Sequence, residues 1–240
     1  MIRFPHYLAR SCRLNGGLAG ISLGEHWRIC RDWSAQLRAG LAPLDLEMPW
    51  VTLMATNRLR QHLEQTCAGA GRVFEYGSGG SSLFFLRRAA ELVSVEHDPA
   101  WFERVRERAS ALGLDTRGLR LVLPEPGQGT SGDVADPDSY RSADPPHAGS
   151  TFRAYASSID AHPDAWFDVV IVDGRSRPSC LRHALSKVRS GGLLVLDNAE
   201  REYYLRYVAI DSAGYDVIEK SFGALVGTAS FTQTMIWRRR

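Results

Sequence analysis

The stretch RVFEYGSGGSSLFFL, residues 72–86, decides the fold of this chain. Val73–Glu75 lies in an apolar run of the kind that forms a buried strand. The turn that follows contains three glycines, Gly77, Gly79 and Gly80. A helix is expected to begin near Ser81 or Ser82. A strand that runs through a glycine-rich turn into a helix presents backbone N–H groups and a helix N-terminus together, which favours an anionic ligand group.

The stretch LVSVEHDPAWFERV, residues 92–105, adds a second strand and an acid. Leu92–Val95 is the predicted strand, and Glu96 lies at its carboxyl end. Asp98 followed by Pro99 is typical of the N-cap and first position of a helix. A carboxylate in this place can accept hydrogen bonds from two ribose hydroxyls, so the two stretches together predict a nucleotide pocket.

The rest of the chain alternates strands with helices. Further strands are expected at 119–123, 167–172, 193–196, 217–221 and 232–237, and further helices at about 99–112, 178–188 and 200–210. Strands separated by helices imply an α/β fold with a doubly wound, mostly parallel sheet. The short link between the last two strands indicates a hairpin, and therefore one antiparallel strand near the carboxyl end.

Two segments, residues 1–68 and 124–150, are expected to lie outside this alternation. Residues 1–68 are predicted to form an N-terminal helical extension to the ligand-binding domain, which spans residues 69–240. The extension would contain a helix at 48–67 and another in residues 26–40, with Trp27, Cys30 and Trp33 on one side. Residues 124–150 lack apolar periodicity and predict a long loop. Two interpretations of this loop remain: it is a lid that excludes water from a site, or it is a disordered insertion.

Composition excludes several classes of function. The chain has 240 residues, of which 44% are hydrophobic and 23% charged, as in an ordinary globular protein. A net charge of +2 gives little reason to expect a nucleic-acid partner. No stretch reaches the roughly 20 apolar residues of a membrane span. The four cysteines lack metal-ligand spacing and no secretory signal precedes them, so reduced thiols in a cytoplasmic protein are expected.

The order of residues in the glycine turn resembles motif I of the class I S-adenosylmethionine (SAM)-dependent methyltransferases. That order is Glu75, any residue, Gly77, any residue, Gly79, whereas a dinucleotide-binding turn would have a third glycine at Ser82. The resemblance continues through SVEHD (94–98), FDVVIVDGR (167–175) and GGLLVLDN (191–198), and covers about residues 45–238. It implies the Rossmann-like methyltransferase fold with a seven-stranded sheet, and SAM as cofactor.

The resemblance also implies the contacts of the cofactor. The turn Gly77–Gly79, with Ser78 at its centre, would pass beneath the methionine part of SAM, and Glu75 would lie near the ammonium group. Glu96 would hold the ribose, and His97 would flank the adenine.

A second set of residues lies at the carboxyl ends of the fourth and fifth strands. Asp173 ends the fourth strand, and Asp197 and Asn198 end the fifth, so their oxygens are expected to converge. This set resembles the metal-dependent O-methyltransferases of the catechol and caffeoyl type, in which an aspartate and an Asp-Asn pair bind magnesium. The resemblance implies a Mg²⁺ site at these three residues, with Asp173 also catalytic.

The chain departs from that type where a catalytic lysine would stand. Ser176 occupies the position, between Arg175 and Arg177, and arginine cannot act as a general base because it stays protonated. The base is therefore absent, supplied by a metal, or elsewhere. The two arginines are expected to pair with a carboxylate or phosphate of the acceptor. Trp50 and its helix are expected to roof the acceptor site.

These patterns predict a SAM-dependent methyltransferase that acts on a small or medium-sized acceptor, at oxygen, with or without a metal. Two alternatives stay open. One is a non-catalytic SAM-fold binding or scaffold protein. The other is an aminopropyltransferase, although such enzymes expect further acids in the glycine loop, where this chain has Ser78, Ser81 and Ser82.

Overall fold

The structure is a computed structural model that describes residues 4–127 and 132–240. Its strands are β1 (Arg72–Tyr76), β2 (Glu91–Glu96), β3 (Leu119–Leu121), β4 (Glu125–Pro126), β5 (Ser150–Thr151), β6 (Phe167–Val172), β7 (Val188–Leu196), β8 (Tyr215–Ala224) and β9 (Phe231–Arg239). Seven of them form one sheet in the order β3-β2-β1-β6-β7-β9-β8. Strand β9 runs antiparallel to both neighbours and the other pairs are parallel, which confirms the predicted sheet.

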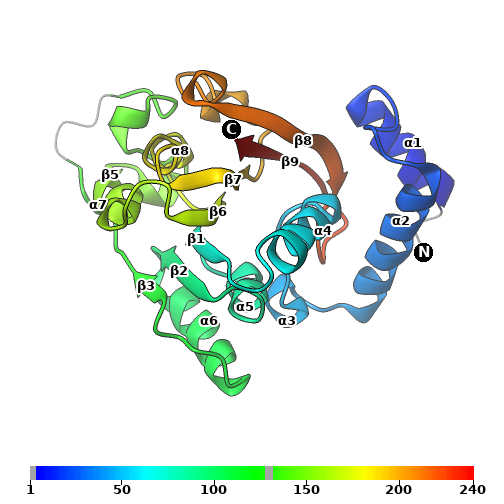
Figure 1. Cartoon of the computed structure of the whole chain (residues 1–240), viewed down its shortest axis with the longest axis horizontal. Helices are drawn as coiled ribbons and strands as arrows, with labels where there is room; N and C mark the ends of the chain where they lie inside the picture. The colour runs from blue at the N-terminus through cyan, green and yellow to red at the C-terminus, as the bar shows by residue number, and fades with distance from the viewer. Residues whose placement is uncertain (1–3, 128–131) are drawn as a thin grey trace.

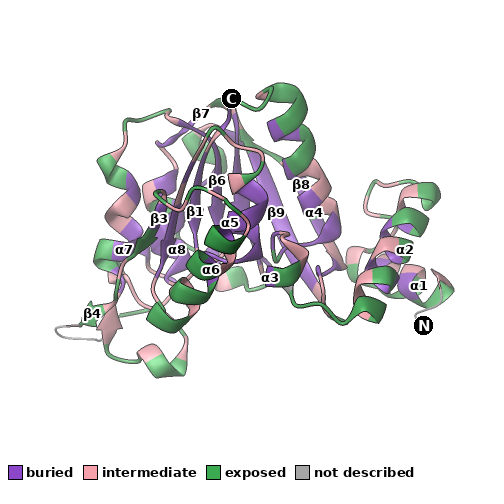
Figure 2. Cartoon of the chain, turned by 90° about the horizontal axis from the view of Figure 1, so that it is seen from below, coloured by how far each residue is buried: buried purple, intermediate pink, exposed green. Residues whose placement is uncertain are grey.

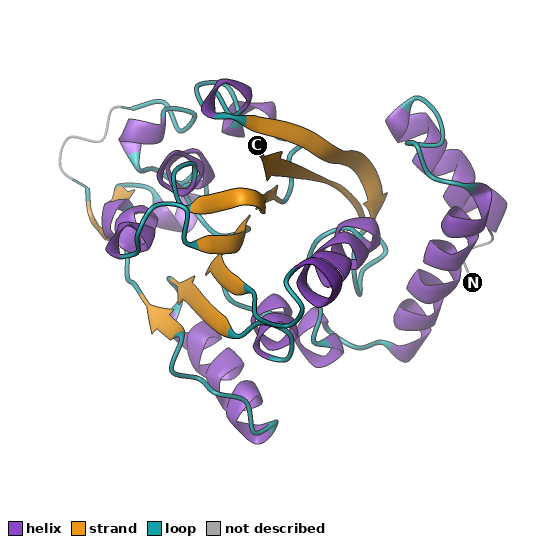
Figure 3. Ribbon diagram, viewed as in Figure 1, coloured by secondary structure: helices purple, strands orange, loops and turns teal. Residues whose placement is uncertain are grey.

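Helices cover both faces of the sheet (Figures 1 and 3). They are α1 (Phe4–Asn15), α2 (Leu23–Ala39), α3 (Pro43–Leu46), α4 (Leu53–Gln61), α5 (Gly80–Leu86), α6 (Pro99–Ala111), α7 (Arg153–Ser157) and α8 (Arg177–Ala184). Side chains alternate along each central strand. In β6, Val169 and Ile171 pack with α4, α5 and α6, whereas Val170 and Val172 pack with α7 and α8. Strand β6 is therefore buried along its whole length (Figure 2).

The helix after β2 begins as the sequence predicts. The Asp98 side chain accepts a hydrogen bond from the Trp101 N–H at 2.9 Å, and Pro99 is the first helical residue. Helix α4 begins five residues later than expected, because the Thr52 side chain caps it by accepting from the Ala55 N–H. A π-helical turn, His62–Thr66, continues it towards β1.

Helices α1 and α2 pack together against the hairpin of β8 and β9, beside α4 (Figure 1). Cys30 and Trp33 are buried there as expected, but Trp27 is 52% exposed, so its predicted place on the same side is wrong. The buried stripe of α2 contains His26, Ile29, Cys30 and Trp33, and the helical period turns Trp27 away from it.

The predicted helix at 200–210 is also wrong. Only two short 3₁₀ turns occur in this region, Glu202–Tyr204 and Asp211–Ala213. The apolar spacing that suggests a helix comes from Tyr204 and Val208, which are buried against the sheet from an irregular segment. Packing of a loop on the core produces the same spacing without helical hydrogen bonds.

The described part of the predicted loop at 124–150 is folded onto the carboxyl edge of the sheet. Strands β4 and β5 close it as a small antiparallel pair. Contacts to α8 and to the segment after β7 tie it down; they are Tyr140 to His183 (3.1 Å), Asp138 to Arg182 (3.4 Å) and Asp133 to Arg206 (3.4 Å). Part of the loop prediction, residues 128–131, lies outside the described residues.

All four cysteines are free thiols. Within residues 4–127 and 132–240, no helix has both the length and the apolar character that crossing a membrane requires.

Candidate cofactor and acceptor site

Gly77 joins the carboxyl ends of β1 and β6. Its φ of +93° is a conformation that only glycine adopts easily. A Cβ atom at Gly77 would lie 2.9 Å from both the Cα and the N of Gly174. The Gly77 N–H donates to the Val95 carbonyl at 2.8 Å. The backbone conformation and the close contact with Gly174 therefore require glycine at this position, whether or not a ligand binds.

Gly79 differs from Gly77 in this respect. Its φ of 176° is ordinary extended backbone, and the nearest protein atom to an added Cβ would be Trp101 Cζ2, 3.9 Å away. Nothing among the described residues requires glycine at this position. Gly79 is buried, but a methyl group added here would fit without displacing a protein atom.

Glu75 places a buried carboxylate beneath the turn. Its Oε2 accepts hydrogen bonds from the hydroxyls of Ser82 and Ser94, and its Oε1 has no hydrogen-bond partner among the described residues. Burial raises the pKa of Glu75 to about 7; the serine hydrogen bonds oppose this and the nearby Glu96 adds to it. A buried carboxylate with one unpaired oxygen can be stabilised by an ammonium group, and the amino-acid tail of SAM would supply one.

Glu96 is already hydrogen-bonded to its own chain. Its Oε1 accepts from the N–H groups of His97 (2.7 Å) and Asp98 (2.9 Å), and its Oε2 from the N–H (3.0 Å) and hydroxyl (3.3 Å) of Ser78. Burial raises the pKa of Glu96, but the bonds from His97 and Asp98 outweigh it and the pKa falls below its ordinary value. Since a carboxylate has about four acceptor positions, a ribose would have to displace the long bond from the Ser78 hydroxyl.

His97 lies in an aromatic cluster that the sequence analysis missed. Its ring centroid is 5.1 Å from that of His147, 5.7 Å from Phe152 and 6.2 Å from Tyr155. These three residues carry no motif. His147 lies in the loop at 124–150, and Phe152 and Tyr155 follow it, so their positions depend on a path that the sequence did not predict. The predicted adenine contact of His97 would therefore involve this cluster as well.

The Arg177 side chain is buried between the carboxyl ends of β6 and β7, and its predicted contact with an acceptor stays untested. The residue is 7% exposed, and its guanidinium donates to Asp173 Oδ1 (3.0 Å). It also donates to the backbone carbonyls of Asp173, Gly174 and Asp197. A fixed positive charge thus occupies the space between the carboxyl ends of β6 and β7.

This arrangement does not fit the magnesium site that the resemblance implied. Asp173 is paired with Arg177, Asp197 Oδ1 accepts from the Thr234 hydroxyl (3.0 Å), and the Asn198 amide donates to Thr232 (2.8 Å). Burial raises the pKa of Asp173 to about 7 and that of Asp197 well above its ordinary value. No group of three or more His, Cys, Asp or Glu side chains suited to a metal occurs in the described ranges.

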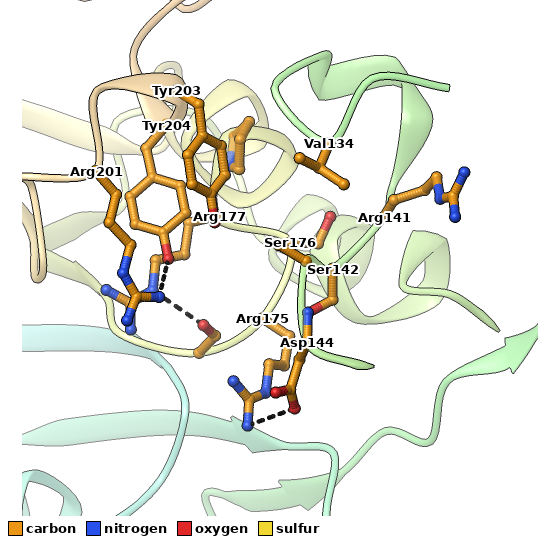
Figure 4. Close-up of a pocket in the computed structure, with 13 residues that line it drawn as sticks. Val134, Arg141, Ser142, Asp144, Arg175, Ser176, Arg177, Arg201, Tyr203 and Tyr204 are labelled. Carbon is orange, nitrogen blue, oxygen red and sulfur yellow. Dashed lines mark hydrogen bonds and ion pairs between the residues drawn. The ribbon is translucent and has the colours of Figure 1, made fainter. Parts of the chain in front are cut away.

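A cavity of about 180 Å³ lies beside this buried arginine (Figure 4). Three stretches of chain line it: 134 and 141–144 from the segment before β5, 174–178 after β6, and 201, 203 and 204 after β7. Arg175 and Arg177, for which the sequence predicts an acceptor contact, are both part of the lining. Trp50 is 51% exposed and is not part of the lining, so its predicted role stays untested.

No protein-family model matches the chain, and no curated protein sequence does. Among solved structures, it is similar to an O-methyltransferase from Bacillus cereus in complex with S-adenosylhomocysteine (SAH). The identity is 14%, the TM-score is 0.55, and the match covers 99% of this chain and 100% of the other. It is also similar to the O-methyltransferase TomG from Streptomyces achromogenes, which is involved in tomaymycin synthesis and was solved with SAM. There the identity is 15%, the TM-score 0.50, and the coverage 100% and 99%. The chain therefore has the fold of the class I methyltransferases.

Proposed function

We propose that the chain is a SAM-dependent methyltransferase that transfers the methyl group to an oxygen atom of a small acceptor. The observation that carries the proposal is the buried Glu75 carboxylate. Its Oε1 has no hydrogen-bond partner among the described residues, and its Oε2 is linked through the Ser82 hydroxyl to the Gly79 N–H. In a methyltransferase fold this is the place for the amino-acid tail of the cofactor. SAM supplies the electrophilic methyl group, and the protein's task is to hold cofactor and acceptor in line.

In this proposal four residues contact different parts of the cofactor. Glu75 binds the ammonium group, and the backbone at Gly79 leaves room for the amino-acid tail. Glu96 binds the ribose once the Ser78 hydroxyl turns away, and His97 packs against the adenine. These assignments follow the sequence resemblance, and the burial and hydrogen bonds of Glu75 support the first of them.

Asp173 is the proposed general base in place of the missing lysine. Its side chain is 16% exposed, it directly precedes Gly174 of the cavity lining, and burial raises its pKa to about 7, near the pH at which a base works best. Arg177 holds it in position. No step of this proposal uses a metal, because the arrangement around Arg177 does not fit one.

Binding of SAH is expected to weaken as the pH falls from 7 to 5.5. Below its pKa of about 7 Glu75 carries a proton, and pairing with the ligand ammonium requires that this proton leave. Affinity should therefore fall by up to about tenfold per pH unit, while the ligand's ammonium group keeps its proton over this range. Calorimetric titration at each pH measures this. In Glu75→Gln the affinity should be lower and independent of pH; a wild-type affinity that does not change with pH would remove Glu75 from the site.

Gly79→Ala is expected to weaken SAH binding by at least about tenfold without destabilising the protein. An added methyl group meets no protein atom closer than 3.9 Å, so the free energy of unfolding should change by less than about 0.5 kcal/mol. The same methyl group would occupy the space proposed for the cofactor. Calorimetry and urea denaturation on one sample separate the two effects. Unchanged SAH affinity would place the cofactor elsewhere.

A non-catalytic binding or scaffold protein with this fold is the alternative that one observation favours, since the hydrogen-bond acceptor positions of Glu96 are already filled within the chain. Incubation with SAM carrying a labelled methyl group and a set of small hydroxyl compounds distinguishes the two. Label in a product supports the enzyme, and SAH binding without transfer to any of them favours the alternative.

A further inference from the structure

The cavity beside Arg177 has a strongly basic lining. Four arginines contribute to it, Arg141, Arg175, Arg177 and Arg201, against a single acid, Asp144. Figure 4 shows the Arg141 guanidinium directed away from the other side chains, and Arg177 is committed to Asp173 and to backbone carbonyls. The positive charge that remains for a ligand is therefore that of Arg175 and Arg201.

Both of these guanidinium groups have weak partners within the protein. Arg175 lies 3.1 Å from Asp144, in an ion pair whose side chains are 38% and 30% exposed, and its Nε donates a long hydrogen bond to His97 Nε2 at 3.4 Å. Arg201 is exposed and donates to the Tyr204 hydroxyl at 2.9 Å. Exposed ion pairs contribute little to stability, so an incoming anion can take the place of the Asp144 carboxylate at small cost.

The remaining lining suits an oxyanion. Burial raises the pKa of Tyr203 to about 12, and the neighbouring Tyr204 adds to this shift. The Tyr203 hydroxyl therefore stays protonated and can donate a hydrogen bond. Guanidinium groups bind carboxylate and phosphate through paired N–H donors. A volume of about 180 Å³ is small for a ligand pocket, which favours a small acceptor or the head group of a larger one.

The cavity also lies next to the proposed chemistry. Gly174 and Ser176 line it, and Asp173 directly precedes them at the end of β6. An acceptor anchored at Arg175 and Arg201 would have its other end near Asp173.

We propose that the acceptor of this protein carries a carboxylate or phosphate group, which Arg175 and Arg201 bind in this cavity. The inference rests on the proposed function, since it names the class of acceptor for the same site. The anionic group is the anchor, and a hydroxyl elsewhere on the acceptor receives the methyl group.

The test is calorimetric titration of the full chain with inorganic phosphate and with benzoate, at constant ionic strength, with and without SAH. Saturable binding of at least one probe is expected. Arg175→Gln and Arg201→Gln should each weaken it by about tenfold, because each removes a charged donor. Arg60→Gln is the matched control, because Arg60 is exposed on α4, is hydrogen-bonded to Asn57, and does not line the cavity. Asp144→Asn should strengthen binding, since it frees Arg175; a merely structural role for these arginines would not produce that gain.

Each outcome decides something. Binding of phosphate alone indicates a phosphorylated acceptor, and binding of benzoate alone a carboxylic acid. If neither probe saturates, or if the cavity variants bind as Arg60→Gln does, the inference is overturned. SAH titration of the same samples keeps the two proposals apart. SAH binding without probe binding removes the anionic acceptor and leaves the methyltransferase. Probe binding without SAH binding removes the methyltransferase, and what remains of the inference is an anion-binding site at Arg175 and Arg201.

Discussion

Replacing Arg177 by methionine is expected to lower the free energy of unfolding by about 3–5 kcal/mol at pH 8. Methionine has a similar length but no charge and no N–H donors. The change would leave the buried Asp173 carboxylate without its counter-charge, and three backbone carbonyls, those of Asp173, Gly174 and Asp197, without donors. Urea denaturation with circular dichroism measures the loss.

Arg175→Met is the matched control for this prediction. Arg175 lies two residues away, and its ion pair with Asp144 is partly exposed, so the cost should be below about 1 kcal/mol. Equal small losses for the two variants would contradict the buried network.

The pH dependence gives a second check on the same variant. Burial raises the pKa of Asp173 to about 7 in the folded protein, against an ordinary value of 3.8. A group with a raised folded-state pKa contributes stability at pH values below its unfolded pKa and loses that contribution as the pH rises through 7. Without Arg177 the ionised form is still less favourable, so the deficit of the variant should be larger at pH 8 than at pH 5.

Gly77→Ala is expected to cost about 3 kcal/mol or more of unfolding free energy. A backbone with φ of +93° costs an alanine about 1 kcal/mol or more, and the added Cβ would lie only 2.9 Å from two backbone atoms of Gly174. That contact joins β1 to β6, so relief requires the two strand ends to separate. Urea denaturation is again the measurement.

Gly113→Ala isolates the contribution of the close contact. Gly113 also has a positive φ, +69°, but an added Cβ there meets no atom within 4 Å. Its loss should therefore reflect backbone strain alone, near 1 kcal/mol. If the two variants lose the same stability, the contact between Gly77 and Gly174 does not hold the strand ends together.

The sheet was predictable because its signals are local. Residues 167–172 are apolar except for Asp168, and the structure has β6 at these bounds. Asp98 and Pro99 mark the start of α6 by capping chemistry alone. The segment at 200–210 shows the limit, because Tyr204 and Val208 have helical spacing for a reason that belongs to the tertiary packing.

The candidate site was predictable only where it follows a strand end. Glu75, Gly77 and Glu96 can be identified from their order along the chain. The inward direction of Arg177 cannot, because most of its partners are backbone carbonyls, which no residue pattern reveals. The contacts of Asp144 and His147 with Arg175 and His97 were equally hidden, since they depend on how a segment without periodicity folds back.

A crystal structure of the native protein grown with SAH tests the central claim most directly. The account predicts electron density for the homocysteine ammonium within hydrogen-bonding distance of Glu75 Oε1, with the ribose at Glu96 and the Ser78 hydroxyl turned away. A fully occupied ligand in another place, or a protein saturated with SAH in which Ser78 and Glu96 keep their present bonds and Glu75 Oε1 stays without a partner, would contradict it.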